Sequence, residues 1–270
     1  MSKPYAIPLS PRGLSSIAPP PPWHYAGDCL IVEFWADPAA AAATLPAGLT
    51  ADPKSPGHAA ALFVDWQFTG ENDELLDPAR YQYREFFILV DALYEGQPVA
   101  YCPYIFVDND SAMMRGMIQG FPKRLGVVHQ TRTFAAPSLA AAQLAPGARF
   151  GATASTAGQR IARAEVKLAG KVEDPSKLGF SGRPIVNLRH FPRLAAGQHD
   201  KPAVHELVMS IMDNPKIAEA WAGEGQLTLP VVENEEVSDL APVRVGAGYR
   251  VSMSYTVTDL KTLADKTHAR

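Results

Sequence analysis

Residues 113–126, which read MMRGMIQGFPKRLG, are the stretch around which we predict the fold of this chain. Two adjacent cations in it, Lys123 and Arg124, have almost only apolar residues and glycines around them. Removing an ammonium from water is costly, so burial of a lysine favours its free amine. A free amine can attack a ketone and form a Schiff base. The stretch therefore predicts a reactive buried lysine; an ordinary surface Lys-Arg pair after a Gly-Phe-Pro turn is the alternative that composition leaves open.

Two physical effects could make this lysine reactive. Lowering the pKa of an ordinary lysine from about 10.4 to about 6.5 requires roughly 5 kcal/mol. We expect burial to supply the larger part, and charge repulsion from Arg124 to supply the rest, although neighbours in sequence need not point the same way. The apolar residues that would bury the lysine are Met113, Met117, Ile118, Phe121 and Leu125.

Most of the remaining chain consists of short segments rich in β-branched and aromatic residues, separated by Gly and Pro. Residues 81–94 and 99–107 read as a hairpin, and residues 39–45 as a helix that follows Asp37-Pro38. Further strands are predicted at 29–35, 59–68, 127–134, 150–168 (a second hairpin), 185–193, 203–212, 226–229 and 248–260, with a turn at 219–223 and a helix or loop at 138–148. This pattern predicts a mainly β (α+β) fold with few helices, as an antiparallel barrel or sandwich.

Composition narrows the class of protein. A length of 270 residues with 47% hydrophobic and 20% charged residues predicts a soluble globular protein. A net charge of −3 argues against nucleic acid as a partner. The sequence shows neither a secretion signal nor an apolar run of about 18 residues, so we expect a cytoplasmic protein without membrane contact. Cys29 and Cys102 are predicted to be buried thiols, and no Cys/His spacing suggests a metal.

Residues 120–126, GFPKRLG, resemble the Pro-Lys-Lys-Leu-Gly segment of the acetoacetate decarboxylase superfamily, whose first lysine is the Schiff-base nucleophile. That family is itself a known case of a lysine activated by desolvation or by a cationic neighbour. The likeness continues in residues 104–110, 219–223 and 227–229, so it covers most of the chain.

We predict a single domain over residues 1–270, because no break in composition marks a boundary, and the polyproline stretch at 19–22 predicts that residues 1–24 form an extended N-terminal arm. The resemblance specifies the fold further. It implies cone-shaped barrels of antiparallel strands that enclose a small apolar cavity, and this cavity receives Lys123. No cofactor is expected. We also expect a homo-oligomer, in which the arm could pack on a neighbouring subunit.

The resemblance also suggests polar residues for the cavity. Glu85 aligns with a family glutamate that lines it, and Asp65 falls where the family has a second one. Carboxylates in a dry cavity can exchange protons near neutral pH. Gln119 is the neutral hydrogen-bonding group that remains near Lys123, because the family's Gly-Arg-Glu tripeptide is replaced by residues 115–117. Its alternative is a solvent-facing side chain.

Further candidates for the cavity are aromatic or apolar. Phenols can bind substrate, although ordinary core packing is the alternative for each tyrosine. These further candidates for binding the substrate or tuning the lysine are Tyr81, Tyr83, Tyr249, Tyr255, Met117, Phe121 and Arg124.

The sequence departs from the family near its N-terminus. Decarboxylases carry an Asn-Arg-Glu-Tyr stretch whose arginine is associated with the substrate carboxylate, and Gly27 occupies its place here. This loss removes a bidentate carboxylate site. We therefore predict a pyruvate aldolase-dehydratase, which condenses pyruvate with an aldehyde and eliminates water, with Lys123, Glu85 and Gln119 as its catalytic residues. The alternatives are a decarboxylase of acetoacetate or a related 3-oxo acid, and a non-catalytic barrel that binds small molecules.

Overall fold

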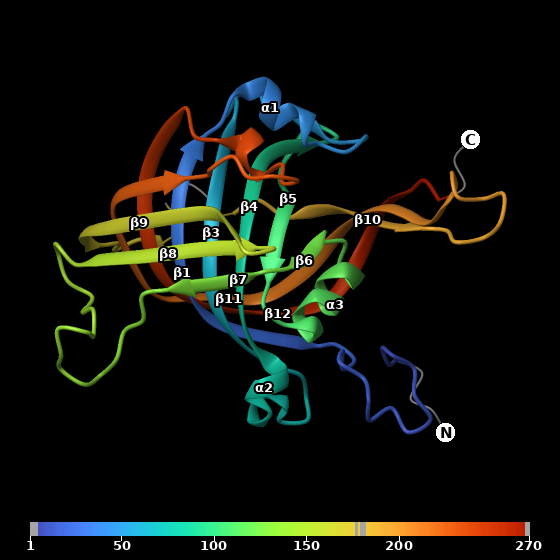
Figure 1. Ribbon diagram of the computed structural model, residues 1–270, viewed down its shortest axis with the longest axis horizontal. Coiled ribbons are helices and arrows are strands. Elements are labelled where there is room, and N and C mark those ends of the chain that lie inside the picture. The colour runs from blue at the N-terminus through green and yellow to red at the C-terminus, as the bar shows by residue number, and fades with distance from the viewer. Residues whose placement is uncertain (1–4, 176–177, 179–181, 268–270) are drawn as a thin grey trace.

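The computed structural model describes residues 5–175, 178 and 182–267 of the chain, so residues 1–4 of the predicted arm lie outside it. Twelve strands form most of the fold (Figure 1). They are β1 (Trp23–Trp35), β2 (Thr50–Ala51), β3 (His58–Thr69), β4 (Gln82–Tyr94), β5 (Gln97–Val107), β6 (Lys123–Leu125), β7 (Val127–Gln130), β8 (Arg149–Thr156), β9 (Gln159–Lys171), β10 (Val186–Pro192), β11 (Pro202–Thr228) and β12 (Arg244–Asp265). The helical segments placed wholly within the described residues include α1 (Pro38–Ala43), η1 (Glu74–Leu76), α2 (Pro78–Tyr81), α3 (Asp110–Ile118) and η3 (Val237–Leu240).

All twelve strands belong to one sheet, whose main path runs β6-β5-β4-β3-β1-β12-β11-β9-β8-β7. β10 pairs with β11, and β2 pairs with β4. The named strands pair antiparallel except β5 and β6, which are parallel. The mainly β fold class with few helices is therefore confirmed.

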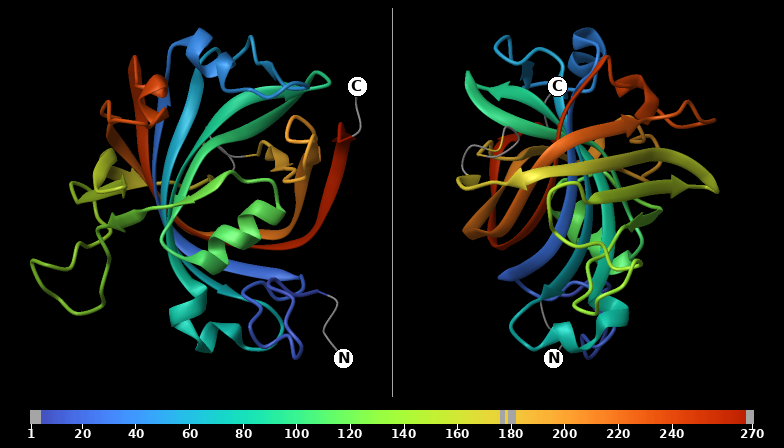
Figure 2. Two further views of the ribbon diagram at one scale, coloured as in Figure 1. Left: turned by 45° about the vertical axis from the view of Figure 1, so that its right-hand side comes forward. Right: turned by 90° about the vertical axis from the view of Figure 1, so that its left-hand side faces the viewer.

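The two ends of this path are consecutive in the chain, with only Gly126 between β6 and β7. The Gly126 amide donates to the Val107 carbonyl at 2.8 Å, and the Thr156 hydroxyl donates to the Leu125 carbonyl at 3.0 Å. A Cβ on Gly126 would lie 2.9 Å from the Ser155 carbonyl oxygen, so the close approach of β5 and β8 requires glycine here. The sheet thus curls into an open, cone-shaped barrel (Figure 2).

Side chains alternate between the two faces of these strands and fill two large apolar clusters. One cluster is centred on Phe34, Phe63, Phe86, Phe106 and Phe150, which lie on β1, β3, β4, β5 and β8. The other lies on the opposite face of the same strands and includes Ile31, Trp66, Tyr83, Phe87 and Ile105. The second cluster also takes residues from α3, so the helix covers this face of the sheet.

α3 follows β5 through a hydrogen-bonded corner. The Asp108 carboxylate accepts from the Arg84 amide at 2.7 Å and from Arg84 Nε at 2.9 Å. Asn109 caps the helix, because its side-chain oxygen accepts from the Ala112 amide at 2.9 Å. The helix ends at Ile118, before Gly120 with its φ of 82° and before Pro122. This corner fixes where residues 110–118 lie over the sheet.

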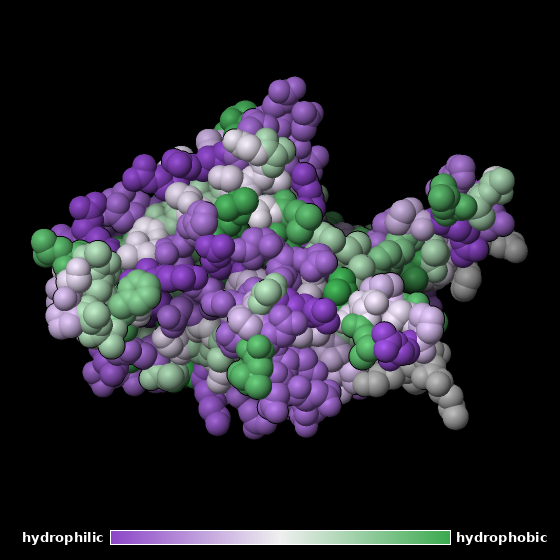
Figure 3. Space-filling view, turned by 60° about the horizontal axis from the view of Figure 1, so that its bottom comes forward, coloured by the Kyte–Doolittle hydropathy of each residue, from purple (hydrophilic) through white to green (hydrophobic). Residues whose placement is uncertain are grey.

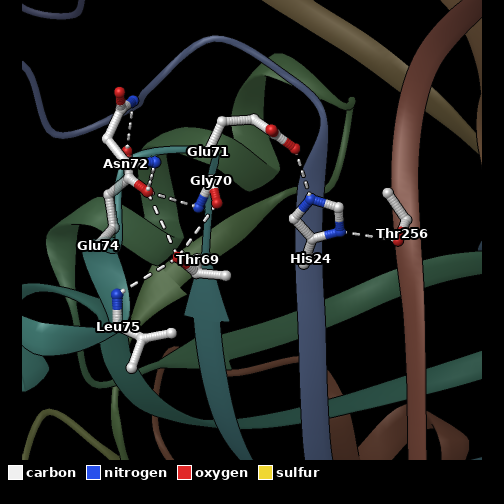
Figure 4. Close-up of polar contacts among 8 residues, drawn as sticks. All are labelled: His24, Thr69, Gly70, Glu71, Asn72, Glu74, Leu75 and Thr256. Carbon is white, nitrogen blue, oxygen red and sulfur yellow. Dashed lines mark hydrogen bonds and ion pairs between the residues drawn. The ribbon is translucent and has the colours of Figure 1, made fainter.

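A compact loop follows β3 near the N-terminal arm (Figure 4). The Glu74 carboxylate accepts from the Gly70 and Asn72 amides at 2.8 and 3.0 Å, which closes the loop. His24 of β1 contacts Glu71 at 3.0 Å and Thr256 of β12 at 2.9 Å. These contacts hold the loop beside the start of β1.

Several expectations about elements are confirmed. The strand predicted at 127–134 ends at Gln130, and the turn predicted at 219–223 is wrong. The helix after Asp37 and both hairpins are present, and Cys29 and Cys102 are free and buried. Residues 138–148 contain neither helix nor strand. The predicted turn at 219–223 is part of the continuous strand β11, because its residues pair with β12 and β9 through local register shifts.

The exterior is mixed in character. Hydrophilic residues cover most of the face shown in Figure 3, and apolar residues form separate patches on it. Within the part of the chain that the structure describes, no helix has the length and apolar character needed to cross a bilayer.

Candidate active site

Lys123 and Glu85 form a buried ion pair on the face of the sheet that α3 covers. Lys123 lies on β6 opposite Ile105, and Glu85 lies on β4 opposite Val107. Lys123 Nζ is 2.5 Å from Glu85 Oε2, and the two side chains are 8% and 7% exposed. Trp66 Nε1 donates to Glu85 Oε1 at 3.3 Å. The predicted burial of the lysine is therefore found, together with a carboxylate that can exchange a proton with it.

The stem of Lys123 lies directly against α3 at Gly116. A Cβ on Gly116 would be 2.2 Å from Lys123 Cε and 2.3 Å from its Cδ. Such distances are far below van der Waals contact. Because Gly116 has no side chain, the Lys123 stem can pass close to α3 and reach Glu85.

Arg115, one residue earlier, is a site residue that the sequence analysis missed. Its side chain is 1% exposed, and its guanidinium carbon lies 3.6 Å from the centroid of the Phe68 ring. Nη1 donates to the Ser111 hydroxyl at 2.5 Å, whereas Nε and Nη2 have no hydrogen-bond partner among the described residues. A buried cation with free donors is costly unless an anion joins it. The argument applied to Lys123, a cation among apolar residues, could have identified Arg115 as well.

Gln119 is buried beside Arg115 at the end of α3. Its Nε2 donates to the Arg115 carbonyl at 3.2 Å, and its Oε1 accepts from the Ser210 hydroxyl of β11 at 3.0 Å. These bonds fix the orientation of the amide and rule out the solvent-facing alternative.

Three tyrosines lie among these groups: Tyr25 and Tyr83 are buried, and Tyr255 is half-buried. The Tyr83 ring centroid lies 5.5 Å from Lys123 Nζ and 5.6 Å from the Arg115 guanidinium carbon. Tyr255 stacks on Tyr25 at 5.1 Å and meets Trp66 edge-on at 5.6 Å. Tyr25 is a second residue that the sequence analysis missed.

The phenols remain neutral in this setting. Burial and then the Glu85 carboxylate raise the pKa of Tyr83 well above its ordinary value. Burial, Tyr25 and Glu85 likewise raise the pKa of Tyr255. Burial raises the pKa of Tyr25, although Arg115 opposes the shift. Neutral phenols can donate hydrogen bonds to a substrate or to a developing alkoxide.

The other predicted aromatic and apolar residues lie at different distances from Lys123. The Phe121 ring centroid is 5.9 Å from Lys123 Nζ, and Met117 is half-buried on α3. Tyr81 packs against Phe68 at 5.5 Å, on the Arg115 side of the site. Tyr249 lies elsewhere, where its hydroxyl donates to Glu33 at 2.7 Å.

The structure does not bring Arg124 to the lysine. Successive residues of a strand point to opposite faces, so Arg124 turns away from Lys123. Its guanidinium forms a bidentate pair with Glu235 at 2.7 and 2.8 Å, and its side chain is 55% exposed. The expectation that Arg124 acts on the lysine by direct repulsion is corrected by this geometry.

Asp65 also lies apart from Glu85. In the register of β3 and β4, Val64 pairs with Glu85 and Asp65 pairs with Arg84. Asp65 is therefore on the opposite face of the sheet, where its carboxylate binds Arg132 at 2.7 Å. The expectation that both carboxylates line one cavity is corrected.

Gly27 of β1 leaves room for the ring of Trp66 to pack against the strand. A Cβ at this position would lie 2.5 Å from Trp66 Cε3. A larger side chain would displace Trp66, which donates to Glu85. The residue that stands where decarboxylases have arginine is thus required for packing.

A family model for acetoacetate decarboxylase matches residues 5–267. The chain belongs to the acetoacetate decarboxylase family. It is accordingly an enzyme of the Schiff-base lyase type. No curated protein sequence matches the chain.

Solved structures of this family resemble the chain over nearly its whole length. The enduracididine biosynthesis enzyme MppR, complexed with the condensation product of pyruvate and imidazole 4-carboxaldehyde, is 36% identical, with 98% of this chain and 97% of that chain covered and a TM-score of 0.89. MppR complexed with pyruvate is also 36% identical, with 98% and 99% covered and a TM-score of 0.88. An acetoacetate decarboxylase-like enzyme from Sphingomonas wittichii RW1 is 24% identical, with 95% and 97% covered and a TM-score of 0.85, and shows the shared fold.

Proposed function

We propose that this enzyme is a pyruvate aldolase-dehydratase in which Lys123 forms the Schiff base. The observation that carries the proposal is the buried Arg115, whose Nε and Nη2 lack partners among the described residues. The 36% identity to MppR, which binds pyruvate and its condensation product with an aldehyde, supports the same substrate class. Family membership favours an enzyme over a non-catalytic binding barrel.

Arg115 provides the carboxylate site that Gly27 does not. Lys123 Nζ and the Arg115 guanidinium carbon lie 5.5 and 5.6 Å from the centroid of the Tyr83 ring, so both cations border the same phenol. Guanidinium binds carboxylate through two parallel hydrogen bonds. Gln119 adds a donor on the same side of the site. A fixed cation beside the carboxylate stabilises the anion, and therefore favours a reaction in which the carboxylate is retained over one in which it leaves as carbon dioxide.

The first half of the reaction makes the nucleophile. The Lys123 ammonium passes a proton to Glu85, and the amine attacks C2 of pyruvate. Glu85 returns this proton to the hydroxyl of the resulting carbinolamine, which leaves as water, and an iminium forms. The Glu85 carboxylate then removes a proton from C3, and the electron pair moves into the iminium to give an enamine.

The second half joins the two substrates. C3 of the enamine attacks the carbonyl carbon of the aldehyde, and the new alkoxide takes a proton from Glu85. Loss of a second C3 proton and of the hydroxyl releases one water and leaves a conjugated iminium. Hydrolysis of this iminium consumes one water, frees Lys123 and releases an unsaturated 2-oxo acid. Overall, pyruvate and aldehyde give product and one water.

Two measurements test the proposal. Incubation with pyruvate and borohydride should add one reduced pyruvate unit to the Lys123 peptide, as seen by mass spectrometry. Pyruvate with an aromatic aldehyde should produce a new ultraviolet absorbance. Lys123→Gln should abolish both signals, and Asp65→Asn, on the opposite face, is the matched control. Fast carbon dioxide release from acetoacetate, without condensation across an aldehyde panel, would instead assign a decarboxylase.

A further inference from the structure

The N-terminal arm packs on α3 of its own chain. Within the described residues 5–22, the Ile17 amide donates to the Ile7 carbonyl at 2.7 Å, and the Ser16 hydroxyl donates to the Ala18 carbonyl at 2.9 Å. Ala18 is fully buried. Figure 2 shows the arm below α3, beside α2. The arm is thus a folded segment with a buried contact near the site.

Ser111 joins the arm to the site. It is 0% exposed, its hydroxyl donates to the Ile17 carbonyl at 2.6 Å, and it accepts from Arg115 Nη1 at 2.5 Å. A guanidinium can only donate, so the hydroxyl must offer Arg115 a lone pair. Its single proton is then directed to the arm. The arm carbonyl therefore sets the direction of the hydroxyl that orients Arg115.

We propose that Ser111 is a positioning residue that couples docking of the N-terminal arm to the orientation of Arg115. This inference rests on the proposed role of Arg115 in binding a 2-oxo acid carboxylate. Coupling is reciprocal, so a bound carboxylate and a docked arm stabilise each other. Ketones without a carboxylate do not use this coupling.

The first test compares two ketones. Ser111→Ala should raise the pyruvate concentration needed for half-maximal borohydride trapping about tenfold, since it removes a hydrogen bond to a charged group. The acetone concentration for half-maximal trapping should change less than twofold. Thr44→Val, which removes a half-buried hydroxyl–carbonyl bond at the end of α1, is the control. Equal effects on both ketones, or no effect on either, would overturn the inference.

The second test approaches the same bond from the arm. Ala18→Gln should displace the arm while leaving Ser111 and Arg115 in place, and should weaken pyruvate trapping but not acetone trapping. Arg12 lies exposed on the arm, so trypsin cleavage after it, followed by intact mass, reports docking. Pyruvate should slow this cleavage severalfold in the wild type and much less in Ser111→Ala.

The outcomes separate this inference from the proposed function. If wild-type enzyme forms no pyruvate adduct, the proposed function fails. Trypsin cleavage without ligand then tests the link to the arm, because Ser111→Ala should be cleaved after Arg12 faster than wild type. If the wild-type adduct forms but Ser111→Ala keeps wild-type discrimination between the ketones and wild-type cleavage, the inference alone fails.

Discussion

The Glu85 carboxylate, 2.5 Å from Lys123 Nζ, gives the lysine a proton acceptor in addition to its burial. A buried amine without a partner would lose its proton through desolvation alone. Here the proton has an acceptor, Glu85, in direct contact. The same carboxylate lies within hydrogen-bond reach of Trp66, which holds it in place. One residue can therefore take the proton before imine formation and move protons afterwards.

Glu85→Gln should separate these two roles. The amide keeps the size of the side chain but cannot accept a proton, so condensation should fall by roughly 10²-fold or more. Borohydride trapping with pyruvate at long incubation should fall much less, because imine formation needs only one deprotonation, which high pH can supply. Product absorbance and adduct mass from the same samples measure both. An equal loss of the two signals would contradict the assignment of proton shuttling after imine formation.

Arg124→Gln should leave the reactivity of Lys123 unchanged. Its guanidinium is paired with Glu235 on the other face, so its removal takes no charge from the site. The pH dependence of lysine acylation, followed on the Lys123 peptide, should match that of the wild type. The protein should become less stable, because the partner carboxylate Glu235 is only 6% exposed and loses its two hydrogen bonds. A shift of the acylation profile by one pH unit would show that repulsion acts across the strand.

At the scale of elements, the site depends on the contact between α3 and β6. The helix provides Arg115 and Gly116, its C-cap residue is Gln119, and the strand provides Lys123. β6 pairs parallel with β5, and this pairing sets the height of Lys123 relative to Glu85. The helix and strand are close only because residue 116 has no side chain.

Gly116→Ala should uncouple stability from activity. Alanine favours the helix interior by up to about 1 kcal/mol over glycine, and the flexible lysine stem can move aside. The thermal midpoint should therefore stay level or rise. Trapping with pyruvate should fall at least tenfold, since Nζ is displaced from Glu85. Gly170→Ala is a matched control, because a Cβ there meets no atom within 4 Å. Unchanged trapping in Gly116→Ala would contradict the close contact.

At the scale of the whole molecule, a buried charged cluster ties distant strands together away from the site. His58 of β3 contacts Asp91 of β4 at 2.9 Å and Glu33 of β1 at 3.5 Å. The Tyr249 hydroxyl of β12 donates to Glu33, and Arg183 lies 3.1 Å from Asp91. Burial lowers the pKa of His58, but the hydrogen bonds and charges of Asp91 and Glu33 outweigh burial and raise it to about 9.

This cluster predicts a loss of stability at high pH. The folded pKa of His58 lies above the unfolded value of about 6.5, so its contribution is complete below pH 6.5 and disappears as the pH rises through 9. We expect the free energy of unfolding to fall by about 1–3 kcal/mol between pH 6.5 and 9.5. Urea unfolding at several pH values measures this fall in the free energy of unfolding. His58→Gln should be less stable at pH 6.5 and should lose this pH dependence; a slope equal to that of the wild type would contradict the prediction.

The sequence by itself determined the local features of this protein. Alternating apolar residues and turn signals at 81–107 specified the hairpin of β4 and β5, because strand period and turn chemistry are local properties. The glycine-rich stretch at 113–126 marked Lys123 as a buried amine, and the family resemblance added Glu85 and the barrel. Residues 219–223 were the local failure, since their pairing with β9 and β12 overrides their turn-like composition.

Only the tertiary structure decided which side chains meet. A one-residue difference in register exchanges the faces of a strand, so pairing of Val64 with Glu85 excluded Asp65 from the site. The same alternation turned Arg124 outward. Whether Arg115 has a partner also depends on residues far away in sequence, among them Phe68, Tyr83 and the arm that bonds Ser111. Charge balance in a buried site is a sum over all neighbours, and the chain specifies those neighbours only once it is folded.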